Sequence, residues 1–170
     1  MEQDLHAHTE TPRLSDEVER EIVELVQAFP EGRQQSALIG ALRAAQEHNG
    51  GYLTPQLIEA VAARLDLPTI RAQAVASFYS MLETQPVGRN SVSVCTNVSC
   101  MLRGGREILA RIESRLGIKA GESTPDNRIF LKREEECLAA CTGAPMVMIN
   151  HQYFENLTPE RVDELIDDLT

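Results

Sequence analysis

The four cysteines of this chain fall in two short pairs, and this pattern constrains the fold more than any other feature of the sequence. Cys95 and Cys100 form a CxxxxC pair, and Cys137 and Cys141 form a CxxxC pair. The sequence contains no other cysteine. Cysteine behaves as a small apolar residue that usually lies singly in protein cores. Its confinement to two segments therefore indicates that four thiols meet at one point.

Three chemistries use several thiols together. Structural zinc takes four thiolates in a tetrahedron, an iron–sulfur cluster takes four and passes electrons, and disulfides take thiols in pairs. Residues 1–8 are acidic and lack the apolar stretch of an export signal, so we expect a cytoplasmic location, where disulfides are rare. Zinc ligands usually lie in short knuckles, although zinc tolerates this spacing. The pattern thus favours an iron–sulfur cluster and leaves zinc open.

The charge balance of the chain is strongly acidic, with a net charge of −10. Nucleic-acid binding needs clustered Lys and Arg, and so does attachment to an anionic membrane surface. No stretch approaches the roughly twenty apolar residues of a membrane span. We therefore expect no nucleic-acid partner and no direct membrane insertion. The helical pair joined at residues 66–69 is expected to pack, rather than to bind DNA as a helix-turn-helix.

Residues 1–12 form a polar stretch without an apolar pattern and are expected to be a disordered tail. His6 and His8 have the HxH spacing of a metal chelate. In such a setting histidines are far more often solvated than bound to metal, and we interpret them so.

Residues 13–86 are expected to form a four-helix domain. Apolar residues recur at helical spacing, Ser15 can cap the first helix, and Pro55 stands at the first position of the third, where a missing N–H costs nothing. Three apolar residues at the end of the fourth helix are expected in the core, namely Phe78, Met81 and Leu82.

The spacing of apolar residues changes after the turn residues 86–90, from a helical period to an alternation typical of strands. Residues 87–170 are therefore expected to form a second domain. The expected elements are a strand at 91–94, a helix at 105–116, a strand at 129–131, a hairpin of 146–149 and 152–154 turning at Asn150-His151, and a helix from Pro159. This β-α-β-β-β-α order is the thioredoxin-like arrangement. The fold class is therefore α+β, with a helical bundle followed by a thioredoxin-like α/β domain.

The right-handed crossover of such a domain brings the carboxyl ends of its first two strands side by side. Cys95 leaves the first of these strands, and Cys137 follows the second by a few residues. We therefore expect the two cysteine loops to meet at one edge of the sheet. The first pair is too widely spaced for the CxxC site of a dithiol redox enzyme.

Four segments carry a resemblance to a known family. Residues 95–105, 136–146 and 153–160, together with 75–81 in the helical part, resemble the 24-kDa (E-type) 2Fe–2S subunit family of respiratory complex I, NADH–quinone oxidoreductase. That subunit is a thioredoxin-like ferredoxin. The chain departs from the family in one place, because Ala139 stands where the family usually has glycine.

The resemblance implies an electron-transfer role. Cys95, Cys100, Cys137 and Cys141 would hold one 2Fe–2S cluster, two thiolates to each iron. The chain would be a subunit of an enzyme and not catalytic alone, with no catalytic residue of its own. FMN and NADH would bind only to the partner flavoprotein, since no GxGxxG loop occurs here. Residues 13–86 would dock that partner, and other iron–sulfur subunits would complete the peripheral arm on the cytoplasmic side of the membrane.

Several expectations concern the surroundings of the cluster. Arg103 and Arg106 would raise its reduction potential if close, but we interpret them as a solvated helix start. Residues 134–136 are three glutamates, interpreted as a solvated face, and the bond before Pro145 is expected to be trans. Two alternatives stay open, namely the equivalent subunit of a bidirectional hydrogenase or NAD-linked formate dehydrogenase, and a zinc-stabilised interaction module.

Overall fold

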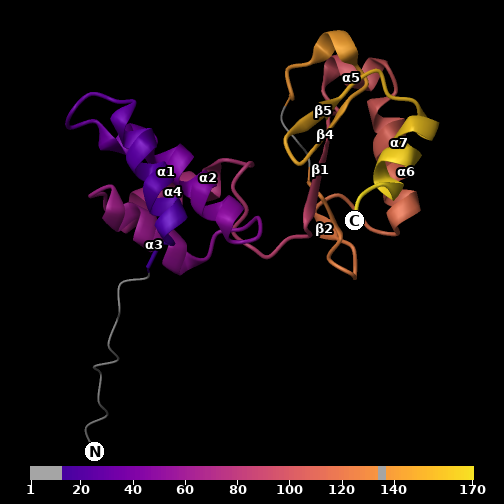
Figure 1. Cartoon of the computed structure of the whole chain (residues 1–170). Helices are drawn as coiled ribbons and strands as arrows, with labels where there is room; N and C mark the ends of the chain where they lie inside the picture. Colours follow the sequence, from indigo (N-terminus) through magenta and orange to yellow (C-terminus); the bar gives the residue numbers. More distant parts are fainter. Residues whose placement is uncertain (1–12, 134–136) are drawn as a thin grey trace, which may run out of the picture. The chain divides into compact units, whose positions relative to one another are not determined.

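The computed structural model describes residues 13–133 and 137–170. The expected disordered tail with His6 and His8, and the acidic run 134–136, lie outside the described residues. The chain divides into two compact units, Met1–Gln85 and Pro86–Thr170 (Figure 1). Each unit has its own hydrophobic core.

The described part of the first unit is entirely helical. Its elements are α1 (Asp16–Gln27), the short 3-10 helix η1 (Gln34–Ala37), α2 (Leu38–His48), α3 (Pro55–Arg64) and α4 (Thr69–Phe78). The predicted caps are present, because the Ser15 hydroxyl accepts the Val18 N–H and the Thr54 hydroxyl accepts the Leu57 N–H. The buried side-chain amide of Gln46 joins α2 to the segment that follows α4. It donates to the Met81 carbonyl and accepts the Glu83 N–H.

The prediction for the end of α4 is only partly right. Leu82 is buried, but Phe78 is 80% exposed and Met81 is 50% exposed, so their assignment to the core is wrong. The helix buries two small residues, Ala72 and Ala76, which lie one turn apart on the same face. Phe78 comes two residues after Ala76 and therefore points away from that face.

The second unit contains a five-stranded sheet within its described residues, in the order β2-β3-β1-β4-β5. The strands are β1 (Asn90–Val94), β2 (Glu122–Ser123), β3 (Ile129–Leu131), β4 (Val147–Ile149) and β5 (Gln152–Phe154). β1 and β3 pair in parallel, and the other neighbours pair antiparallel. The parallel pair and the predicted hairpin are confirmed, with positive φ at both Asn150 and His151, as the type I′ form of a two-residue hairpin loop requires.

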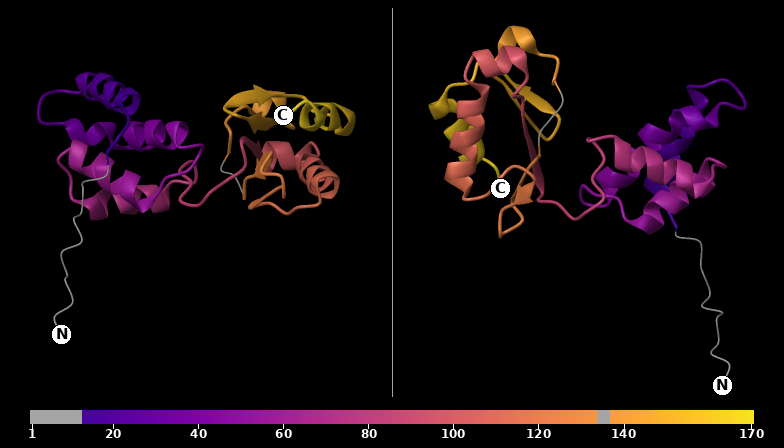
Figure 2. Two further views of the ribbon diagram at one scale, coloured as in Figure 1. Left: turned by 60° about the horizontal axis from the view of Figure 1, so that its bottom comes forward. Right: turned by 180° about the vertical axis from the view of Figure 1, so that it is seen from behind.

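Helices cover one face of this sheet. The unit contains α5 (Val98–Leu102), α6 (Gly105–Leu116), the 3-10 helix η2 (Cys141–Gly143) and α7 (Pro159–Asp167). Every second residue of a strand faces these helices. Val92 of β1, Ile129 of β3 and Val147 of β4 therefore pack in one core with apolar residues of α6 and α7. These two helices lie side by side (Figure 2) and are joined by the ion pair of Arg111 with Asp163. The α+β fold with a thioredoxin-like domain is thereby confirmed.

Three elements of this unit were not predicted. β2 has two residues, η2 has three and α5 has five, and segments so short display too little periodicity to be recognised. In neither unit do the described residues include a helix long and apolar enough to cross a membrane.

Candidate metal centre

The two cysteine loops leave the same edge of the sheet. Cys95 directly follows β1 and Cys100 lies in α5, whereas Cys137 follows β3 and Cys141 begins η2. Because β1 and β3 are parallel, their carboxyl ends adjoin. Side chains from both loops accordingly form one apolar cluster, made of Cys95, Cys100, Leu138, Ala144 and Met146. The expected meeting of the two loops is confirmed.

Backbone N–H groups of the second loop point at the sulfurs of the first pair. The Leu138 N–H donates to the Cys95 sulfur, and the Met146 N–H donates to the Cys100 sulfur. Within the second loop, the Ala139 N–H donates to Cys137 Sγ over 3.4 Å. Such bonds stabilise negative charge on a ligating sulfur and orient it. The two loops thus form one site rather than two.

The pKa values of the two buried thiols are shifted in opposite directions. Burial alone would raise the pKa of Cys95, but hydrogen bonds from the N–H groups of Leu138 and Asn97 outweigh it, and its pKa is lowered. Burial, followed by the hydrogen bond to Cys95, raises the pKa of Cys100 to about 11. Cys100 is therefore the proton donor and Cys95 the acceptor within the pair. Metal binding must displace that proton.

The four thiols differ sharply in exposure. All four cysteines are free; Cys95 and Cys100 are buried, whereas Cys137 and Cys141 are exposed. Within the described residues, no three His, Cys, Asp or Glu side chains lie close enough together to hold a single metal ion. The donors are arranged as two cysteine pairs in adjoining loops, and two thiolates for each of two irons is the ligand set of a 2Fe–2S cluster.

The structure explains the family's glycine at position 139. Ala139 has φ +61°, in the left-handed region that residues with a Cβ adopt only at a cost. In this conformation the Ala139 N–H still donates its hydrogen bond to Cys137 Sγ. The methyl group therefore does not remove that hydrogen bond, and its cost is the strain of a left-handed backbone at a residue with a Cβ.

Three supporting features were missed or misread from the sequence. A Cβ at Gly105 would lie 2.7 Å from the Cys95 carbonyl oxygen, so only glycine lets α6 begin against the first cysteine loop. Arg103 is exposed, yet its Nη1 donates to the Ala144 carbonyl over 3.1 Å and so ties the two loops together. The Ala144–Pro145 peptide bond is cis, which corrects the expectation of trans.

Comparison with known proteins finds a matching family and several relatives. The family model described as "Thioredoxin-like [2Fe-2S] ferredoxin" matches residues 22–170. The E-type subunit of the NADH-quinone oxidoreductase of Rickettsia bellii (strain RML369-C) is 43% identical over 146 residues, which cover 86% of this chain and 87% of that protein. "NADH dehydrogenase [ubiquinone] flavoprotein 2, mitochondrial" of Dictyostelium discoideum is 41% identical over 148 residues, covering 87% of this chain and 60% of that protein.

The solved structure of an NAD⁺-reducing [NiFe]-hydrogenase in the H₂-reduced state has a TM-score of 0.66. The match covers 77% of this chain and 22% of the hydrogenase chain, at 24% identity, and is a likeness in fold.

The fold and the four thiols together define an iron–sulfur protein of the thioredoxin type. The family match covers most of the chain, and the Rickettsia bellii protein is matched over 87% of its own length. The chain belongs to the thioredoxin-like [2Fe-2S] ferredoxin family. The resemblance seen in the sequence is confirmed, and the family to which the chain belongs is one of iron–sulfur proteins.

Proposed function

We propose that this chain is the electron-transfer subunit of an NADH–quinone oxidoreductase, where it holds one 2Fe–2S cluster beside a flavin-bearing subunit. The observation that carries the proposal is the convergence of the two cysteine pairs, with N–H groups of one loop directed at the sulfurs of the other. The identity of 43% to the Rickettsia bellii protein over 86% of the chain supports the same assignment.

In this proposal each cysteine loop holds one of the two irons. Cys95 and Cys100 would hold one iron, and Cys137 and Cys141 the other. The bound cluster supplies reversible one-electron chemistry. The chain's own contribution is to hold the thiolates: the N–H groups stabilise their charge, while Leu138 and Met146 keep water from the first pair.

The helical unit is proposed as the docking element for the flavin-bearing partner. Ile70 and Phe78 on α4 are 69% and 80% exposed, and Met81 beyond the helix is 50% exposed. Large apolar side chains gathered at one helix of a small unit are typical of a surface that a partner covers. FMN and NADH would bind to that partner, and the assembly would form the peripheral arm on the cytoplasmic side of the membrane.

Two alternatives to this assignment remain. The first is the equivalent subunit of a bidirectional hydrogenase or of an NAD-linked formate dehydrogenase, and the fold likeness to the NAD⁺-reducing hydrogenase is compatible with the hydrogenase. The second is a zinc-stabilised interaction module, which would carry no electrons; it is disfavoured because, among the described residues, no three His, Cys, Asp or Glu side chains lie close enough together to hold a single metal ion.

Two measurements on anaerobically purified protein separate these functions. The first is the visible absorption and low-temperature EPR spectrum, before and after dithionite, with iron, sulfide and zinc content. We expect about two irons and two sulfides per chain, no signal when oxidised and a spin-half signal when reduced. A colourless protein with one zinc would overturn the proposal.

The second measurement identifies the proteins that co-purify with the chain. Their identity distinguishes a quinone reductase from a hydrogenase or formate dehydrogenase.

A further inference from the structure

A cleft of about 550 Å³ lies beside the first cysteine loop of the second unit. Val94 and Thr96, the two neighbours of Cys95, both line it. Its other walls come from α6, from the loop before β2 and from the residues that follow β3. Anything that occupies this cleft is therefore in contact with the loop that holds the buried cysteines.

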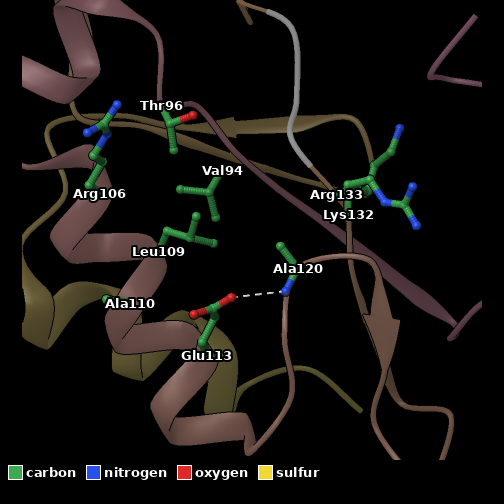
Figure 3. A pocket seen from close by; sticks show the side chains of 9 residues that line it. All are labelled: Val94, Thr96, Arg106, Leu109, Ala110, Glu113, Ala120, Lys132 and Arg133. Carbon is green, nitrogen blue, oxygen red and sulfur yellow. Dashed lines mark hydrogen bonds between the residues drawn. The ribbon is translucent and has the colours of Figure 1, made fainter.

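The cleft has an apolar floor and a basic rim. Val94, Leu109 and Ala120 contribute apolar surface, and Arg106, Lys132 and Arg133 contribute three cations. The acidic lining residue Glu113 is already engaged, because its carboxylate accepts a hydrogen bond from Lys119 Nζ over 2.9 Å. It also accepts the Ala120 N–H over 3.0 Å (Figure 3). Among the lining residues that the structure describes, the cations therefore outnumber the one engaged carboxylate, in a chain whose net charge is −10.

The cations are not gathered around one point. Arg106 stands on the α6 side of the cleft, and Lys132 and Arg133 stand on the strand side opposite (Figure 3). A single phosphate is gripped by donors that converge on it. Cations spread along opposite sides of an apolar floor instead match an extended segment with an apolar side chain between acidic ones.

We propose that this cleft receives an acidic segment of the flavin-bearing subunit. An apolar side chain of that segment sits against Leu109 and Ala120, and its carboxylates lie at Arg106 and Arg133. The inference rests on the proposed function and adds to it a second contact, next to the cluster and separate from the exposed face of α4. In an acidic chain, a positive cleft is where an acidic partner docks without repulsion.

The test uses the full chain with its cluster and the flavin-bearing subunit of the same organism's NADH-oxidising complex. Arg106→Glu and Arg133→Glu reverse the rim charge. Arg89→Glu is the matched control, because Arg89 is exposed and precedes β1 at the opposite end of that strand. The dissociation constant is measured at low and at high salt, and the absorption and EPR spectra of each variant verify that the cluster is intact.

We expect each rim variant to weaken association by roughly tenfold or more at low salt, with less of the salt dependence shown by the unaltered chain. Arg89→Glu should change it by less than about twofold. If the unaltered chain does not bind the flavin-bearing subunit at all, the proposed function fails together with this inference. If it binds and the rim variants behave as Arg89→Glu does, the function stands and the assignment of the cleft is wrong. Saturable binding of inorganic phosphate at the cleft below about 1 mM, followed by NMR, would overturn it in favour of a small-anion site.

Discussion

The two cysteine pairs occupy opposite environments within one site. Cys95 and Cys100 are 2% and 1% exposed and receive N–H groups from the facing loop, whereas Cys137 and Cys141 are open to solvent. The charge of the first pair must be stabilised by fixed dipoles of the protein, and that of the second is stabilised by water as well. The first pair therefore depends on the fold for the stabilisation of its charge, and the second pair forms the solvent-exposed side of the site.

The largest expected effect is on the cluster content of two single variants, one in each cysteine pair. We expect Cys100→Ser to abolish the cluster, because water cannot reach the buried site to replace the thiolate. Cys141→Ser should retain part of it, since at an exposed position solvent can complete the iron's ligands. Iron and sulfide per chain, measured after anaerobic reconstitution, check this expectation. Equal loss in both variants would contradict the comparison.

Thiol labelling of the cluster-free protein tests the difference in exposure directly. We expect iodoacetamide to modify Cys137 and Cys141 about a hundredfold faster than Cys95 and Cys100, since the buried thiols react only after local opening. Peptide mass spectrometry over time gives the four rates. In urea sufficient to unfold the protein the four rates should become similar, which controls for intrinsic reactivity.

Gly105→Ala tests how tightly the buried pair is packed. The added Cβ would lie 2.7 Å from the Cys95 carbonyl oxygen and 2.9 Å from that of Cys100, so we expect a loss of about 2–3 kcal/mol in the free energy of unfolding. Gly117→Ala at the other end of α6 meets no atom within 4 Å but has φ +66°. It should cost about 1 kcal/mol from backbone strain alone. Urea denaturation of both variants gives the comparison.

Ala139→Gly probes the exposed pair and should have the smallest effect. Glycine relieves the left-handed backbone at this position, so we expect the variant to be more stable by about 1 kcal/mol. Ala140 has φ −107°, which alanine adopts freely, and Ala140→Gly should be destabilising instead. Thermal unfolding of the two variants checks the opposite signs. A destabilised Ala139→Gly would mean that the methyl group itself packs usefully.

The sequence predicted the site in outline because spacing and topology are both visible in it. The strand at residues 91–94, the crossover and the strand at 129–131 were sufficient to bring Cys95 and Cys137 to one edge. The N–H donors of Leu138 and Met146 were not predictable, because every residue except proline has an N–H and only the folded loop directs it. Phe78 was placed wrongly for a related reason: an apolar residue at the end of a helix looks the same whether the chain or a partner covers it.

The parallel pairing of β1 with β3 also sets an order of events during synthesis. The first pair is made well before the second, with a whole helix and two strands between them, and the Met146 N–H that contacts Cys100 comes last of all. Contacts so distant in sequence form late in folding. The proposed four-cysteine site is therefore complete only once the chain has been synthesised as far as Met146, so its assembly requires most of the second unit to be present.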